Sequence, residues 1–406
     1  MQKIFLVRVS LCYTLLRNLI FFDKYNYKGI IFNVFLIKNI MKIKCSKKVL
    51  ARALNIASKA VSPNNTLPVL NNILIKAEGK KVFFSATNLE IAINTIIEAD
   101  VLNEGSITIP SKILTSYIGL LKEGDIELKS ELGMSLSIKS THSETKIKGI
   151  APDEFPMIPK VEDAISFKIP SKNFKEAVEQ VAFAASSNTA RPVLTGVLFR
   201  VKKDELTMVA TDSYRLSEKK LKLKEMARDD VECLVPARTT QELGRILDGS
   251  EDIEVEVGKN QILFRSGNTV LTSRLIEGNF PEYEKILPKE TKTKCHTSVE
   301  DLVLAVKKVS LFVMETNNNI KMTVTNDGKM LVSTEETQVG EGRADVDVKV
   351  EGENNKVALN AQYLLDVLSS IGEDEVFVEL VDKINPILLK PLKKTDYRHI
   401  IMPLKL

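Results

Sequence analysis

The chain has few of the residues that bind metals or carry out catalysis. Its 406 residues include only three histidines and four cysteines. The cysteines form no CxxC pair and have no histidine at ligand spacing, so the sequence encodes neither a zinc site nor a disulfide framework. Scattered free thiols are typical of a reducing compartment, and we expect a cytoplasmic protein that holds no metal and no cofactor.

Catalytic motifs are missing as well. The histidines, at positions 142, 296 and 399, are not paired with a plausible nucleophile, and there is no GxSxG, P-loop or strand-linked GxGxxG. Acid pairs at 229–230 and 335–336 are the best candidates for a two-metal nuclease site. Neither pair recurs elsewhere, and both lie in loop-like or strand-edge contexts, which is typical of solvated charge. We therefore expect a chain that is not an enzyme.

Long apolar runs are also absent, even from the N-terminal segment. Residues 1–40 are rich in Phe, Ile, Leu and Asn, but charged side chains interrupt every apolar run before the roughly 18 residues of a membrane span. No small-residue cleavage site follows the apolar stretch 11–22, which argues against a signal peptide. We expect residues 1–40 to be a non-native extension, with Met41 as the true start and no membrane association. A membrane anchor is the minor alternative.

The formal charge of +4 comes from this segment. Residues 1–40 contain six basic residues and one acid, which leaves the rest of the chain at about −1. Tight binding to phosphates through bulk electrostatics needs a basic excess, which this body lacks. If the chain handles DNA, its basic residues must be gathered on one surface.

A threefold repeat, with a period of about 125 residues, dominates the sequence. Its most similar segments are SITIPSKILTSYIGLLKEGDIELKS, ECLVPARTTQELGRILDGSEDIEVEV and KVALNAQYLLDVLSSIGEDEVFVEL. Each predicts a short strand, then an amphipathic helix, a glycine where the helix ends, and an alternating strand. Pro110, Pro236 and Asn360 correspond to one another directly before the predicted helices. The corresponding glycines after the helices are Gly124, Gly249 and Gly372.

The start of each repeat predicts a further helix. Ser46, Ser171 and Ser298 stand where N-caps are expected, each before apolar residues at helical spacing. Strand pairs lie between the two helices of each repeat, and Thr87 corresponds to Thr211 within them. The sequence thus predicts an α+β protein of three tandem domains, at 41–165, 166–293 and 294–406, each packing two helices on one face of an antiparallel sheet.

Basic residues recur on the polar faces of the predicted helices. Taken singly, such lysines are most often simply solvated. Their recurrence favours a surface that meets phosphates without reading bases. These residues are Lys47, Lys48, Arg52, Lys59, Lys112, Lys172, Lys175, Arg238, Arg245, Lys307 and Lys308.

Four segments, RPVLTGVLFR, ATDSYRLS, LIEGNFPEYEKILP and HIIMPLKL, closely resemble the bacterial sliding clamp family, the beta subunit of DNA polymerase III. The resemblance covers essentially all of residues 41–406. It implies the DNA clamp fold, a head-to-tail homodimer and a ring of six repeats around double-stranded DNA, held without sequence preference. It also implies a non-catalytic processivity factor for replication and repair. Its expected partners are the DNA polymerase III alpha subunit, the clamp loader complex and other proteins with a clamp-binding motif.

The resemblance also implies a partner-peptide cleft between the second and third domains and the C-terminal tail. Most of the matching residues are aliphatic, which suits short peptides with apolar anchors. Taken singly, Leu194, Leu216 and Ile286 would be assigned to the core. The family's cleft maps onto Leu194, Thr211, Ser213, Tyr214, Arg215, Leu216, Pro281, Lys285, Ile286, Ile400, Ile401, Met402, Pro403, Leu404, Lys405 and Leu406.

Other family sites map onto the chain in the same way. The dimer contact maps onto Leu311 and Phe312, which would meet the other subunit near Ile147. DNA contacts map onto Asn64, Lys112, Asn188, Thr189, Arg191 and Arg238. The chain departs from the family pattern at four of its site positions: Ser213 replaces a glycine, Tyr214 a histidine, Lys285 an arginine, and Asn64 a basic residue.

Two other classes of function remain open at this point. A DNA-modifying enzyme with an unrecognised site would show turnover and metal dependence. A protein scaffold that never touches DNA would not load onto circular DNA.

Overall fold

The computed structural model describes residues 40–62, 67–159, 161–313, 318–338 and 340–405. The described residues fall into two compact units. The first holds those up to Ser58 and those of Pro63–Ser85 and Ile96–Pro156. The second holds Lys59–Ser62, Ala86–Thr95 and the described part of Met157–Leu406, and so contains the second and third repeats together.

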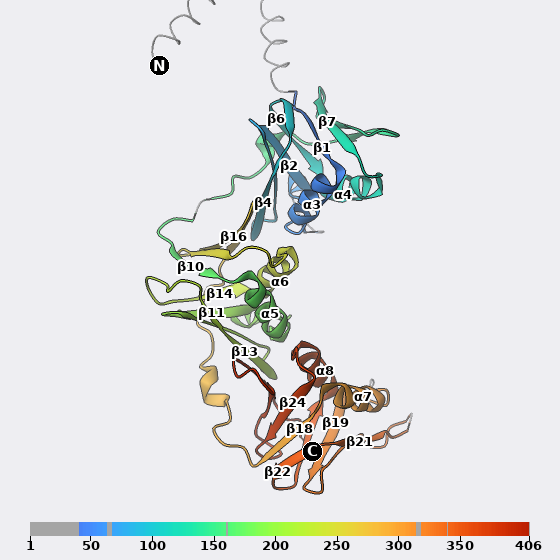
Figure 1. Cartoon of the computed structure of the whole chain (residues 1–406), viewed down its shortest axis with the longest axis vertical. Helices are drawn as coiled ribbons and strands as arrows, with labels where there is room; N and C mark the ends of the chain where they lie inside the picture. Colours follow the sequence, from blue (N-terminus) through green and yellow to red (C-terminus); the bar gives the residue numbers. More distant parts are fainter. Residues whose placement is uncertain (1–39, 63–66, 160, 314–317, 339, 406) are drawn as a thin grey trace, which may run out of the picture. The chain divides into compact units, whose positions relative to one another are not determined.

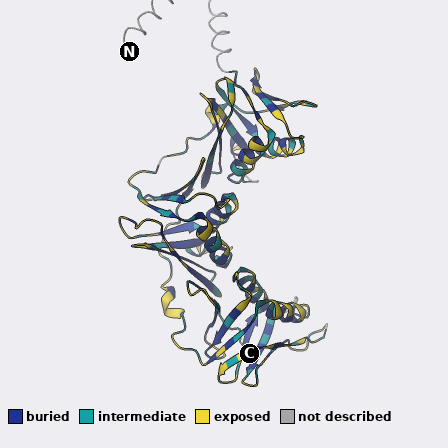
Figure 2. Ribbon diagram, viewed as in Figure 1, coloured by how far each residue is buried: buried dark blue, intermediate teal, exposed yellow. Residues whose placement is uncertain are grey.

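Each repeat has a pair of helices in contact with one another, as predicted (Figure 1). One face of every helix carries the apolar residues and is buried, while the opposite face is exposed (Figure 2). The first helices of the repeats are α3 (Lys47–Ser58), α5 (Ser171–Val181) and α7 (Val299–Ser310). The second helices are α4 (Ser111–Leu120), α6 (Ala237–Ile246) and α8 (Ala361–Ser370).

The second helices begin and end where the repeat predicts. Their N-cap residues are Pro110, Pro236 and Asn360. Asn360 caps α8 through its side chain, which accepts hydrogen bonds from the N–H groups of Gln362 and Tyr363. Beyond the helices, Gly124, Gly249 and Gly372 all have positive φ angles, which glycine adopts without strain.

The first helices differ in how they begin. Ser298 is the N-cap of α7, and its hydroxyl accepts the N–H of Asp301 at 3.3 Å, as predicted. The predicted cap at Ser171 is wrong, because Pro170 is the N-cap and Ser171 is the first helical residue. Pro170 keeps an extended backbone, with a φ of −60° and a ψ of 122°, and the helix begins directly after it, one residue earlier than predicted. The Ser171 hydroxyl is buried without a partner among the described residues.

The strands of the first repeat form antiparallel pairs. One sheet has the order β5 (Asp100–Asn103), β1 (Lys42–Ser46), β7 (Asp125–Glu131), β8 (Ser135–Lys139) and β9 (Glu144–Lys148). A second group places β2 (Asn72–Glu78) between β3 (Lys81–Thr87) and β6 (Gly105–Pro110).

The second and third repeats each contribute two sheet segments. In the second repeat these are β10 (Ile165–Ile169), β15 (Ile253–Val257), β16 (Gln261–Ser266) and β17 (Thr269–Arg274), and separately β14 (Val231–Pro236), β11 (Gly196–Lys202), β12 (Glu205–Thr211) and β13 (Arg215–Lys222). In the third they are β22 (Lys349–Gly352), β18 (Thr293–Ser298), β24 (Glu375–Leu380), β25 (Ile387–Pro391) and β26 (Tyr397–Ile401), and separately β21 (Arg343–Asp347), β20 (Lys329–Ser333), β19 (Asn319–Thr325) and β23 (Asn355–Asn360). The α+β class is confirmed, but a repeat has two sheets where one was predicted.

Sheet segments of different repeats join through two antiparallel strand pairings. β17 pairs with residues 91–95 of β4 (Ile91–Glu98), and β13 pairs with β26. The second pairing makes one continuous nine-stranded sheet out of strands from the second and third repeats. The described residues contain no helix that is both long and apolar enough to cross a membrane.

Candidate functional site

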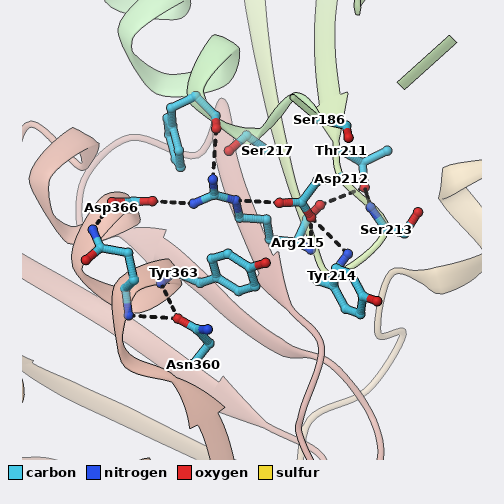
Figure 3. Close-up of polar contacts among 12 residues, drawn as sticks. Ser186, Thr211, Asp212, Ser213, Tyr214, Arg215, Ser217, Asn360, Tyr363 and Asp366 are labelled. Carbon is cyan, nitrogen blue, oxygen red and sulfur yellow. Dashed lines mark hydrogen bonds and ion pairs between the residues drawn. The ribbon is translucent and has the colours of Figure 1, made fainter. Parts of the chain in front are cut away.

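The turn from Thr211 to Arg215 connects β12 to β13 and carries four of the predicted cleft residues (Figure 3). The Thr211 hydroxyl donates to the Arg215 carbonyl at 2.6 Å and accepts the N–H of Ser213 at 3.1 Å. Oδ1 of Asp212 accepts the N–H groups of Tyr214 and Arg215. These bonds fix a tight turn in which Ser213 has a φ of 80°, the left-handed region that favours glycine.

The first repeat builds the same turn from different residues. The Thr87 hydroxyl donates to the Ile91 carbonyl at 2.9 Å and accepts the N–H of Leu89 at 3.0 Å. Asn88 takes the role of Asp212 by accepting the N–H groups of Glu90 and Ile91. The predicted correspondence of Thr87 with Thr211 therefore extends to each hydrogen bond of the turn.

Arg215 links the turn to the third repeat. Its Nε donates to Asp212 at 3.0 Å, its Nη1 to Asp366 of α8 at 2.5 Å, and its Nη2 to the Phe183 carbonyl at 3.0 Å. Aromatic rings lie against the guanidinium, with centroids 4.5 Å away for Tyr363 and 5.3 Å for Phe183. The side chain is only 11% exposed, so this charge is held by partners from both repeats.

Leu216, the next residue along β13, belongs to a different group. Consecutive side chains of a strand point to opposite faces, which separates Leu216 from Arg215. Leu216 packs in an apolar cluster with Ile400, the residue opposite it on β26. The other buried members of this apolar cluster are Leu198, Val209, Leu234, Tyr283 and Leu388, with Val193, Ile276, Phe280 and Leu287 packed against them half-buried.

The first repeat does not reproduce the apolar cluster. In the first repeat, the positions that correspond to Val209, Leu216 and Leu234 hold Ser85, Ala92 and Thr108. Thr108 is occupied by polar contacts, since its hydroxyl accepts from Asn72 at 3.0 Å and donates to the Ile150 carbonyl at 2.8 Å. Of the two repeats that contain this turn, the second has large apolar residues at all three positions and the first does not.

Predicted cleft residues outside the two strands differ in exposure. Leu194, in the 3-10 helix Pro192–Thr195, is buried. Pro281, Lys285 and Ile286 lie in or beside the 3-10 helix Tyr283–Ile286 and are exposed, and Lys285 forms an ion pair with Glu282. Ile286 leaves 44% of its surface exposed next to the buried Tyr283, so it could contact a ligand.

Two backbone hydrogen bonds hold the C-terminal tail beyond β26. The N–H of Met402 donates to the Tyr214 carbonyl at 2.8 Å, which holds the tail beside the turn. The N–H of Leu404 donates to the Ala358 carbonyl at 2.8 Å, at the edge strand β23. Met402, Pro403 and Leu404 are half-buried, Lys405 is exposed, and Ile401 belongs to the core of the third repeat. Leu406 lies outside the described residues.

The seam between β13 and β26 contains buried polar groups. Glu218 is 2% exposed and forms an ion pair with Arg398 at 2.7 Å. Lys219, also buried, pairs with Asp396 at 3.0 Å. The fully buried His399 meets the Ser217 hydroxyl at 2.6 Å and stacks on Phe183. Burial lowers the pKa of His399 to about 3, and the nearby Arg215 charge adds to this effect.

The residues predicted to contact DNA are mostly exposed. Arg238 donates to the Ser62 hydroxyl at 3.0 Å, while Lys112, Asn188, Thr189 and Arg191 are open to solvent. Asn64 lies outside the described residues. Several basic side chains on the exposed helix faces form no ion pair with any described residue, which leaves their charge free: Lys48, Lys112, Lys172, Lys175, Lys307 and Lys308.

The residues predicted for dimerisation lie on two structural edges. Leu311 follows α7 and is 68% exposed. Phe312 is half-buried against Gly342, where a Cβ would lie 2.7 Å from its Cδ2. Ile147 is in β9, the last strand of its sheet, and β21 of the third repeat is likewise a sheet edge.

Sequence reasoning missed Asp366, Tyr363 and Phe183 as partners of Arg215. The nearest of them is about 30 positions from Arg215 and Asp366 is 151 positions away. The only available signal was an acid in the predicted second helix of the third repeat, and the corresponding positions hold Ser116 and Glu242. The described residues contain no group of acids, histidines or cysteines able to hold a metal ion.

Comparison with known proteins agrees with this architecture. Models of the DNA polymerase III beta subunit match in chain order: the N-terminal domain at residues 41–159, the central domain at 168–282 and the C-terminal domain at 284–405. The beta sliding clamp of Staphylococcus aureus is 33% identical over 364 residues, covering 87% of this chain and 96% of that protein. That of Staphylococcus epidermidis is 32% identical over 377 residues, covering 90% and 99%.

Solved structures give the same result. The DNA polymerase sliding clamp of Bacillus subtilis superposes with a TM-score of 0.85 at 26% identity, covering 90% of this chain and 99% of that one. The DNA polymerase III beta subunit of Thermotoga maritima gives 0.85 at 26% identity, covering 90% and 100%. With all three domain models matched in order and these relatives aligned over nearly their whole length, the chain belongs to the DNA polymerase III beta subunit family, the beta sliding clamps.

Proposed function

We propose that two copies of this chain close head to tail into a ring around double-stranded DNA. As a member of the beta sliding clamp family, the chain is a non-catalytic subunit that acts in DNA replication. The ring would confer processivity in replication and repair by tethering the polymerase to the duplex it encircles. We place this activity in the cytoplasm and assign the domains to 41–165, 166–293 and 294–406, with residues 1–40 as an extension outside them.

The observation that carries the ring is the pattern of strand pairing. β17 pairs with β4, and β13 pairs with β26. The strand that corresponds to β4 and β13 in the third repeat is β21, and the one that corresponds to β17 and β26 in the first repeat is β9. Both end their sheets, and a second copy would pair them in the same way.

Both edges carry exposed charges of mixed sign. β9 presents Glu144, Lys146 and Lys148, and β21 presents Arg343, Asp345 and Asp347. Lys146 and Asp347 also form ion pairs within the chain, with Glu131 and Lys329. Leu311, exposed beside the third repeat's edge, would gain an apolar contact in the dimer. The proposed dimer seam comprises Leu311, Phe312 and, in the other copy, Ile147.

Contact with DNA would be made by the exposed helix faces and by the segment that contains Asn188, Thr189 and Arg191. The unpaired lysines of α3, α4, α5 and α7 supply positive charge to a chain whose body is nearly neutral. Such contacts are independent of sequence and weaken with salt, so they permit sliding. The proposed contact residues are Asn64, Lys112, Asn188, Thr189, Arg191 and Arg238.

Partners would dock on the apolar cluster beside the Thr211–Arg215 turn. The DNA polymerase III alpha subunit, the clamp loader and other proteins with a clamp-binding motif would insert apolar side chains near Leu194, Leu216, Ile286, Ile400 and Met402. Burial of each leucine-sized anchor offers about 1.5–3 kcal/mol, so two anchors offer about 3–6 kcal/mol before the ordering costs. A micromolar dissociation constant corresponds to about 8 kcal/mol, so we expect a short peptide to bind with micromolar affinity at most.

Retention on circular DNA tests this function directly. Loaded by the clamp loader onto a nicked circle, the protein should co-elute with DNA in gel filtration and be released when the circle is cut. Direct binding to a linear duplex should be weak. Equal retention on linear and circular DNA would contradict encirclement, and no loading at all would favour a scaffold that does not touch DNA.

A further inference from the structure

Arg215 lies between two parts of the molecule with different roles. On one side it belongs to the turn that carries Ser213 and Tyr214, next to the proposed docking site. On the other side it is bonded to Asp366 and stacked on Tyr363, both in α8 of the third repeat. The guanidinium is thus shared between the docking surface of one repeat and the helix pair of the next (Figure 3).

The conformation of this turn depends on where Arg215 is held. Asp212 uses Oδ1 to bond the backbone of the turn and Oδ2 to bond Nε of Arg215. A movement of the guanidinium would therefore displace the Asp212 carboxylate, which also accepts the N–H groups of Tyr214 and Arg215. This bonding holds Ser213 at a φ of 80°, which is a strained conformation for a residue with a Cβ. If Arg215 no longer bonds Asp212, relaxation of the turn would relieve that strain.

The equivalent turn of the first repeat shows which contacts are particular to the turn from Thr211 to Arg215. Asn88 replaces Asp212 and Ile91 replaces Arg215, so that turn keeps its backbone bonds but has no arginine side chain at this position. It reaches the following repeat indirectly, because Asn88 donates to the Ser62 hydroxyl, which also accepts from Arg238 of α6. Of these two turns, only the one from Thr211 to Arg215 bonds the following helix directly. Asp366 is itself held in place by a second hydrogen bond, because Gln362 donates to its other carboxylate oxygen at 2.7 Å.

We propose that Asp366 and Tyr363 are positioning residues that hold Arg215 and its turn, so that binding of a partner peptide is coupled to the contact between the second and third repeats. This inference rests on the proposed docking site and adds its regulation. Coupling of this kind is reciprocal: whatever loosens the contact weakens peptide binding, and bound peptide tightens the contact.

The test compares Asp366→Asn, which keeps the shape and removes the charge, with Glu300→Gln as the matched control. Glu300 is an exposed acid of α7 without an ion pair in the described chain. Glu300→Gln changes the net charge by the same amount as Asp366→Asn, because each replaces a carboxylate with an amide. We expect calorimetric titration with a peptide carrying the polymerase alpha subunit's clamp-binding motif to show about tenfold weaker binding to Asp366→Asn, within the range usual for coupled sites. Glu300→Gln should bind as the wild type does. Equal affinities for all three proteins would overturn the proposal.

Amide hydrogen exchange separates this proposal from the docking site on which it rests. Without peptide, the amides of Ser213, Tyr214 and Arg215 should exchange faster in Asp366→Asn than in Glu300→Gln; unchanged exchange would overturn the positioning role. If exchange accelerates but the wild type binds no peptide, the positioning role stands and the docking site is wrong. Should Asp366→Asn fail to fold, the wild type alone decides: saturating peptide should slow exchange in α8, and unaltered exchange there would overturn the coupling.

Discussion

Leu89 and Ser213 adopt the same left-handed backbone conformation, with φ angles of 75° and 80°, at the same position of two turns built by the same hydrogen bonds. A residue with a Cβ in this region costs about 1–2 kcal/mol relative to the right-handed conformation. Both turns therefore store strain that glycine would relieve. The family resemblance places a glycine at the second of these positions.

Ser213→Gly should raise the free energy of unfolding by about 0.5–1 kcal/mol, because relief of left-handed strain exceeds the added entropy of the unfolded chain. Ser187→Gly is the control, since Ser187 is exposed and has no positive φ. It should lower stability slightly. Denaturant unfolding of the three proteins measures both effects, and a loss of stability in Ser213→Gly would show that the serine is not strained.

Leu311→Lys should convert the dimer to a folded monomer. Leu311 is 68% exposed in the single chain, so a charge there does no harm to the fold but would be buried in the proposed seam. Leu304→Lys makes the same substitution at an exposed position of α7 and should remain dimeric. Sedimentation velocity distinguishes the two, and an unchanged coefficient for Leu311→Lys would place the seam elsewhere. The double variant with Phe312→Lys should give the same monomer, with some loss of the packing against Gly342.

Removing two unpaired lysines should reduce the salt dependence of DNA binding. Each phosphate contact contributes about 0.9 to the slope of log K against log salt, so Lys172→Ala with Lys175→Ala should lower the slope by about 1.8. Lys220→Ala with Lys222→Ala is the control, because these strand lysines pair with Glu205 and Asp204. Anisotropy titrations on a linear duplex give the slopes. Equal reductions in the two variants would mean that the helix faces have no special role.

Deleting residues 402–406 should abolish detectable peptide binding while leaving the dimer intact. The deletion removes the Met402 bond to Tyr214 and the Leu404 bond to Ala358, but leaves β26 and the proposed seam unchanged. Lys405→Ala, a change at an exposed tail position, should bind peptide normally. Calorimetry with the polymerase peptide decides the matter. Undiminished affinity of the truncated protein would show that the docking site does not involve the tail.

Acid should destabilise the seam between β13 and β26. His399 has a pKa lowered to about 3 in the folded chain, against 6.5 for an ordinary histidine. Between these values the unfolded state binds a proton that the folded state does not, so stability falls as pH falls below 6.5. Between pH 7 and pH 5 the loss should be about 2 kcal/mol for this group.

The control for His399 is the exposed His142. Denaturant unfolding of His399→Phe should lack most of the acid-dependent loss, while His142→Ala should keep it. A wild-type stability that is equal at pH 7 and pH 5 would contradict the shifted pKa.

Features that depend on neighbouring residues in the sequence could be predicted, but contacts between residues far apart in the sequence could not. The second helices could be placed because Pro110, Pro236 and Asn360 mark their starts and apolar spacing marks their length. The division of each repeat into two sheets could not be predicted, since alternation in a strand identifies its buried face but not its neighbours. The bond between Arg215 and Asp366 could not be predicted for the same reason. The local sequence of the turn and that of α8 contain no information about contacts between residues 151 positions apart.

The two strand pairings that join repeats differ in chemistry. Where β4 meets β17, every paired residue is uncharged, and Thr95 and Thr269 share a hydroxyl hydrogen bond of 2.9 Å. Where β13 meets β26, Glu218 pairs with Arg398, and Arg215 and Lys219 reach acids beyond the strands. Protonation changes the charge of acidic and basic side chains and leaves hydroxyl and aliphatic contacts unaffected. The pairing of β13 with β26 therefore depends on the ionisation of its side chains, whereas the paired residues of β4 and β17 have no charge to lose.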